Sequence, residues 1–195
     1  MAETSFSAIA ARVTLAAVSL AIAVACGLGA WQLSAPLSAP AIFPFSETFY
    51  VRSVSAKTPA EALQWAREAV ETAPARPENW LLLARANQMQ DGYVSPRVVT
   101  ALRRSYAVGA LAPNAHEWRL AYVYTNWGAL PRDLQMSARN EILVYSTRGA
   151  GKAYLRPLLA MTTDPDARLA LGLLTLRRQT EDQVRELESR HNSVP

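Results

Sequence analysis

Few residues of this chain have the types and spacing that catalysis needs. His116 and Glu117 are adjacent, but the second histidine of an HExxH zinc motif is missing. Glu141 is a carboxylate of the kind that glycosidases use in pairs, and nothing in the sequence locates a second carboxylate near it. With one cysteine and two histidines in 195 residues, we expect no metal site, no cofactor and no enzyme activity.

Two other patterns have a functional and a structural interpretation. The run GAGK at 149–152 resembles part of a phosphate-binding loop but lacks the GxxxxGK[ST] spacing, so a glycine pair that ends a helix is the favoured interpretation. A dense aromatic group would suit either a sugar-stacking platform or buried packing. Its spacing of three and four residues favours packing, because one face of a helix repeats with that period. The group comprises Trp118, Tyr122, Tyr124 and Trp127.

Charge and composition suggest two unlike parts in one chain. Half of the residues are hydrophobic and only 18% are charged, which is low for a soluble domain and high for a polytopic membrane protein. The net charge of +4 is dispersed over arginines that alternate with acidic residues, so we expect no nucleic-acid partner. The two arginine pairs, at 103–104 and 177–178, are too short to form a basic stripe.

Residues 13–33 contain no charge, and sixteen of these 21 residues are hydrophobic. As a helix this run is roughly 31 Å long, close to the thickness of the hydrocarbon core of a membrane. We expect a retained signal-anchor helix at 13–33 after a cytoplasmic tail at 1–12. A cleaved signal peptide, or a lipoprotein signal with Cys26 as the lipidated residue, remains an alternative. Arg12 precedes the span and the next basic residue is Arg52, which predicts a cytoplasmic N-terminus and a periplasmic C-terminal domain in a bacterial inner membrane.

Residues 34–57 contain three prolines before position 45 and are predicted to form a proline-rich linker. From residue 58 onward the predicted connections are short, and the sequence contains recognisable signals for helix N-termini. These signals include capping boxes at Thr58–Glu61 and Asn114–Glu117. No run alternates as a strand does, so the class is all-α, built from antiparallel helix pairs over 58–195. The predicted helices cover about 58–72, 77–91, 95–109, 114–127, 131–148, 152–161, 164–178 and 180–190.

One stretch of this helical region resembles the tetratricopeptide repeat. Small residues at the end of one helix pair are followed by a proline, a tryptophan and further small residues, which permits close helix packing. The resemblance covers 58–90, and 96–127 is a degraded copy. The corresponding prolines, Pro74 and Pro113, are 39 residues apart, whereas the family's repeat has 34 residues. The matching positions are Ala62, Ala66, Ala69, Pro74, Trp80, Leu83, Ala84 and Asn87.

The resemblance implies a concave face that binds a protein partner through the first helix of each pair. It implies that Arg85 and Arg119 are exposed neighbours, with Gln88 and Asn126 one turn further on and Trp127 beside them. Two guanidiniums beside amides suit a carboxylate of an acidic peptide or an acidic glycan. Arginines that are merely solvated or paired with Glu78 and Glu117 are the structural alternative.

These expectations describe a membrane-anchored periplasmic scaffold for a cell-envelope assembly. A loose likeness in residues 114–145 favours exopolysaccharide biosynthesis or export as that assembly. One alternative is a glycan-binding or glycan-processing domain that uses Trp118, Trp127 and Glu141. Another is an accessory subunit of an integral membrane complex, whose span packs through Gly27 and Gly29.

Overall fold

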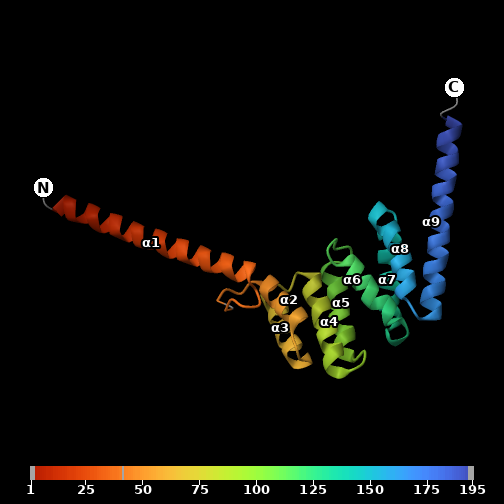
Figure 1. Ribbon diagram of the computed structural model, residues 1–195, viewed down its shortest axis with the longest axis horizontal. Coiled ribbons are helices and arrows are strands. Elements are labelled where there is room, and N and C mark those ends of the chain that lie inside the picture. The colour runs from red at the N-terminus through yellow and green to blue at the C-terminus, as the bar shows by residue number, and fades with distance from the viewer. Residues whose placement is uncertain (1–2, 41, 193–195) are drawn as a thin grey trace.

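The computed structural model describes residues 3–40 and 42–192, and all its regular structure in these ranges is helical. Figure 1 shows a row of short helices between two long ones, with α1 leaving one end of the body and α9 standing at the other. The elements in chain order are α1 (Glu3–Ser34), α2 (Ser46–Ser55), α3 (Pro59–Thr72), α4 (Pro77–Asp91), α5 (Pro96–Val108), α6 (His116–Thr125), the 3-10 turn η1 (Trp127–Ala129), α7 (Arg132–Tyr145), α8 (Gly149–Met161) and α9 (Pro165–Asn192).

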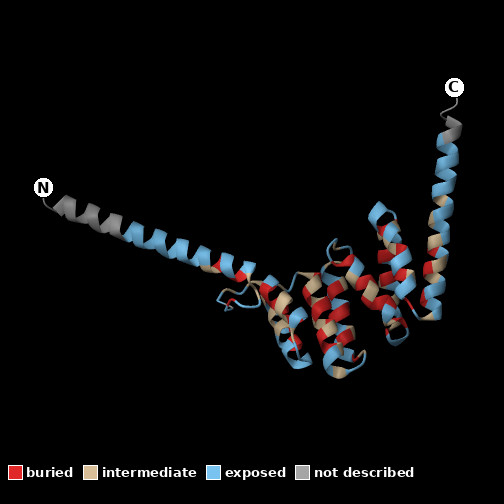
Figure 2. Ribbon diagram, viewed as in Figure 1, coloured by how far each residue is buried: buried red, intermediate tan, exposed pale blue. Residues whose placement is uncertain are grey.

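Helix α1 is long and apolar enough to cross a membrane. Its segment Thr14–Ser34 has a mean hydropathy of 1.9, and almost all of its residues are exposed, as Figure 2 shows. This segment coincides with the predicted span at 13–33. Of the predicted tail at 1–12, residues 1–2 and the side chains of 3–12 lie outside the described part of the chain.

A buried amide joins the end of α1 to the body. The Gln32 side chain is fully buried, and its Oε1 accepts hydrogen bonds from the backbone N–H groups of Ile42 and Phe43 at 3.0 and 2.9 Å. Its Nε2 donates to the Phe43 carbonyl at 2.7 Å and to Oγ1 of Thr48 at 3.3 Å. The segment predicted as a linker is therefore folded against both neighbours, and it contains α2, which the sequence analysis did not predict.

The starts of the next helices follow the local signals in the sequence. Proline occupies the first positions of α3, α4 and α5, where its missing N–H costs no hydrogen bond. Oγ1 of Thr58 caps α3 by accepting from the N–H of Glu61 at 3.2 Å. Helix α4 ends at Gly92, whose φ of 77° is the left-handed conformation that glycine adopts most easily.

Neighbouring helices pack as pairs, and α2 with α4 and α6 with α8 also touch across the pairs. A first apolar cluster joins α2, α3 and α4 around Phe49 and the small residues Ala62, Ala66 and Ala69, which are 1% exposed or less. A second, larger cluster joins α4 to α9 and includes Leu102, among others. The alanines allow the helix axes to approach, which is the role that their spacing predicted.

The structure corrects three predicted boundaries. Helix α6 begins at His116 with Ala115 as its N-cap residue and no side-chain cap, so the predicted capping box at 114–117 does not form. The two helices predicted at 164–178 and 180–190 are one continuous helix, α9, because neither proline nor glycine interrupts the chain there. The glycine pair at 149 and 151 begins α8 instead of ending α7.

Candidate functional site

Two of the predicted partner-binding residues lie together between α4 and α6. Nε2 of Gln88 donates to Oδ1 of Asn126 at 2.7 Å, and Nδ2 of Asn126 donates to the carbonyl of Tyr122 at 2.8 Å. The Tyr122 hydroxyl donates in turn to Oε1 of Gln88, and burial raises the pKa of this phenol. Both amides are therefore already hydrogen-bonded within the chain.

Arg85 lies half-buried on α4, close to Tyr50 of α2. Burial raises the pKa of the Tyr50 phenol, and the nearby positive charge of Arg85 acts in the opposite direction. The Tyr50 ring meets the Trp118 ring edge to face, with 6.0 Å between the centroids. Within the described part of the chain, the Arg85 guanidinium has no hydrogen-bond or ion-pair partner.

Arg119 lies in the interior between α5, α6 and α7, and none of its side chain is exposed. Its Nε and Nη2 atoms donate to the carboxylate of Glu141 at distances up to 3.2 Å. The expectation that Arg119 belongs to an exposed arginine pair is therefore wrong. Its remaining donors bind three carbonyl oxygens around the end of α5, those of Ser105, Gly109 and Ala110.

The Glu141 carboxylate also binds hydrogen-bond donors other than Arg119. The Tyr106 hydroxyl donates to Oε2 at 3.0 Å, and the Tyr106 ring lies 4.2 Å from the Arg119 guanidinium carbon. Nδ1 of His116 is 2.7 Å from Oε1, a distance at which the Nδ1–H tautomer donates to the carboxylate. His116 is only 3% exposed and stacks on Tyr145, which corrects the interpretation of this histidine as a surface residue in the first turn of its helix.

We name this group the Arg119 cluster; its members are Ser105, Tyr106, His116, Arg119 and Glu141. The cluster fastens α5, α6 and α7 together through charge-assisted hydrogen bonds. The sequence analysis found no partner for Glu141. No local signal connects it to Arg119, because the two residues are 22 positions apart and meet only when α6 and α7 pack.

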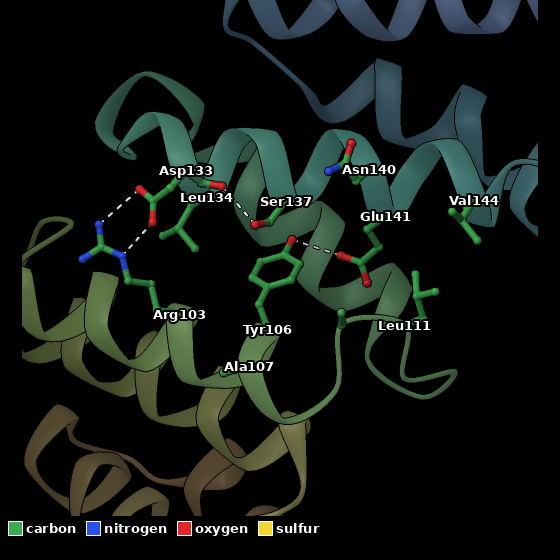
Figure 3. Close-up of a pocket in the computed structure, with 11 residues that line it drawn as sticks. Arg103, Tyr106, Ala107, Leu111, Asp133, Leu134, Ser137, Asn140, Glu141 and Val144 are labelled. Carbon is green, nitrogen blue, oxygen red and sulfur yellow. Dashed lines mark hydrogen bonds and ion pairs between the residues drawn. The ribbon is translucent and has the colours of Figure 1, made fainter.

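A groove of about 520 Å³ lies between α5 and α7, above the Arg119 cluster (Figure 3). Arg103 and Asp133 form an ion pair at one end, with donor–acceptor distances of 2.7 and 3.1 Å, and this hydrogen bonding lowers the pKa of Asp133. Tyr106 and Glu141 lie near its middle, and the apolar side chains of Leu111 and Val144 lie at the other end. Both carboxylates on the groove are paired with arginine, so neither is arranged as a general acid or a nucleophile.

The aromatic residues of α6 and η1 serve packing. Tyr124 and Trp127 are 1% and 3% exposed, and their rings stack with 4.9 Å between the centroids. Arg139 covers the Trp127 ring at 5.3 Å. Trp127 is therefore buried and is not part of an exposed binding face, so Arg85, Gln88 and Asn126 are the predicted residues that retain surface access.

No three His, Cys, Asp or Glu side chains gather into a metal-binding group in the part of the chain that the structure describes. No protein-family model, no curated protein and no solved structure matches the chain. The class of the protein is thus defined by its architecture, an all-helical domain joined to one apolar helix that is long enough to cross a membrane.

Proposed function

We propose that this protein is a membrane-anchored adaptor of the bacterial cell envelope, whose helical domain binds a protein partner. The observation that carries this proposal is the contrast between α1 and the rest of the chain. The segment Thr14–Ser34 of α1 is apolar and almost wholly exposed, whereas the helices from α2 onward bury two apolar clusters of their own. An exposed apolar helix of this length is stable in lipid, and the self-contained domain then lies beside the membrane.

A retained anchor with a periplasmic domain agrees best with the features of α1. The helix is continuous from Glu3 to Ser34 and passes through the exposed Cys26, so its apolar surface continues beyond the residue that lipidation would use. The buried Gln32 amide then holds the domain directly against the end of the span. Arg12 on the N-terminal side of the span favours a cytoplasmic location for that side.

The orientation predicts which cysteines a membrane-impermeant maleimide can reach. In a Cys26→Ala background, Thr100→Cys on the exposed surface of α5 should be labelled in intact spheroplasts. The control, Ser5→Cys on the N-terminal side of the span, should be labelled only after lysis. Labelling of Ser5→Cys but not of Thr100→Cys in intact spheroplasts would reverse the proposed topology.

The surface around Arg85 is the proposed partner-binding site. The helix pairs and the contacts between alternate helices are similar to a tetratricopeptide arrangement, in which the first helices of successive pairs form the binding face. Here Arg85 of α4 lies near Tyr50 of α2, whose ring in turn contacts Trp118 of α6. A carboxylate followed by an apolar side chain suits this combination, so an acidic segment of an envelope protein is the proposed ligand, with polysaccharide export as its setting.

Charge reversal at Arg85 tests this site. Arg85→Glu should reduce by at least about tenfold the amount of partner recovered after cross-linking in membranes, because it sets two carboxylates against each other. Arg97→Glu, which makes the same charge change at an exposed position on α5, should leave the recovery unchanged. Equal recovery with both variants would refute the proposed site.

A further inference from the structure

Helix α9 has two apolar faces, and the body covers one of them. Ala167, Leu171 and Leu174 are 8% exposed or less and pack against the body. Arg178, one turn further on, donates to Oγ of Ser146 at 3.2 Å and to the backbone of α7. Residues 182–189 are all exposed, so the second half of the helix projects beyond the body (Figure 2).

The other apolar face of α9 is exposed along nearly its whole length. Its residues recur at steps of four, three, eight and three, which keeps them on one side of a helix with 3.6 residues per turn. Each of them is 47–65% exposed, and from first to last they span roughly 27 Å. We name this face the leucine stripe, and its members are Leu169, Leu173, Leu176, Val184 and Leu187.

The first part of the leucine stripe forms one wall of a groove between α7 and α9. This groove has a volume of about 690 Å³, and Leu169 and Leu173 line it on the α9 side. Leu143, which is 41% exposed, and Arg139 line it on the α7 side. The groove also carries charged side chains, Arg139 on the α7 side and Asp164 and Asp166 at the start of α9. A groove of this shape between two helices suits a third helix that presents an apolar face.

The second half of α9 is itself such a helix. Residues 179–192 carry four acidic residues against two arginines, a net charge of −2, beside Val184 and Leu187. Residues 165–178 carry three arginines against one aspartate, a net charge of +2. Two copies of α9 in antiparallel orientation therefore bring halves of opposite charge together, whereas a parallel pair brings like charges together.

We propose that this chain forms a symmetric dimer in which the leucine stripes of two copies pack in antiparallel orientation. Leu169 then lies opposite Leu187 of the second copy, and Leu173 lies opposite Val184. The second half of each α9 then lies along the α7–α9 groove of the other copy. This inference concerns self-association, so its outcome is separate from that of the partner proposed for Arg85.

The mass of the full chain in detergent tests the dimer. The unmodified protein should have the mass of two chains by light scattering, and Leu173→Glu with Leu176→Glu should have the mass of one. Both leucines are about 60% exposed, so the helical content of this double variant should be unchanged. Gln179→Glu, an exposed position of α9 outside the stripe, should remain dimeric. A single-chain mass for the unmodified protein, or a dimer that survives the double substitution, would overturn the proposal.

Cysteine cross-linking tests the orientation. In a Cys26→Ala background, the combination of Leu169→Cys and Leu187→Cys should give an oxidised dimer, because the two positions meet across the interface. Either substitution alone should give none, since equivalent positions then lie roughly 27 Å apart. Leu169→Cys with Arg185→Cys, which faces away from the stripe, is the matched control and should also give none. A dimer cross-linked by Leu187→Cys alone would indicate parallel helices and contradict the proposal.

Discussion

Replacement of Glu141 by alanine should lower the free energy of unfolding by about 3–5 kcal/mol, the usual cost of removing one partner from a buried ion pair. The substitution leaves the Arg119 guanidinium without its carboxylate at a site where none of the side chain reaches solvent. It also removes the acceptor of the Tyr106 hydroxyl. Urea denaturation of the full chain in detergent, monitored by the circular dichroism of its helices, measures the decrease in the free energy of unfolding.

Two variants separate the effect of burial from the effect of charge. Asp133→Ala breaks the ion pair with Arg103, which also joins α5 to α7, but each of those side chains is 53% exposed. Its cost should stay below about 1 kcal/mol, because water screens exposed pairs. Arg119→Met with Glu141→Leu removes both buried charges and should cost less than Glu141→Ala alone. A loss for Glu141→Ala as small as that for Asp133→Ala would contradict the role given to the Arg119 cluster.

The helix starts could be predicted wherever the signal is local. Pro59, Pro77 and Pro96 each begin a helix in the structure as the sequence indicates, because a proline at the first turn affects only its own backbone neighbours. Helix α2 was missed because it begins after Phe45 without a side-chain cap or a proline. Its stability comes from burying residues such as Phe49 against α3, which is a tertiary contact that no local pattern records.

The placement of Arg119 shows why the candidate site was harder to predict than the fold. Successive residues of an α-helix differ in direction by about 100°, so a modest rotation of α6 exchanges the exposed and buried sides. In the structure Trp118 faces Tyr50 of α2, and the next residue, Arg119, points into the interior between α5 and α7. The local sequence signals located α6 to within two residues of each end, but they could not set its rotation, which depends on the contact between Arg119 and Glu141.

Gly151→Ala should destabilise the domain by about 3 kcal/mol, the upper part of the range for overpacking at a buried position. Gly151 is buried near the start of α8, and a Cβ there would lie 2.0 Å from the carbonyl oxygen of Tyr145 and 2.4 Å from its carbonyl carbon. Both are backbone atoms, so no side chain can move aside to make room. The end of α7 would have to shift, and with it the Tyr145 ring that stacks on His116.

Gly149→Ala is the matched control for this clash. Gly149 is exposed two residues earlier in α8, and nothing lies within 4 Å of the position that its Cβ would occupy. Alanine there should be neutral or should stabilise the helix by about 0.5–1 kcal/mol, because it restricts the unfolded chain more than glycine does. Thermal unfolding should therefore show a midpoint lowered by roughly 6–12 °C for Gly151→Ala and no decrease for Gly149→Ala. Equal midpoints for the two variants would mean that α7 and α8 are not packed as closely as the contact at Tyr145 requires.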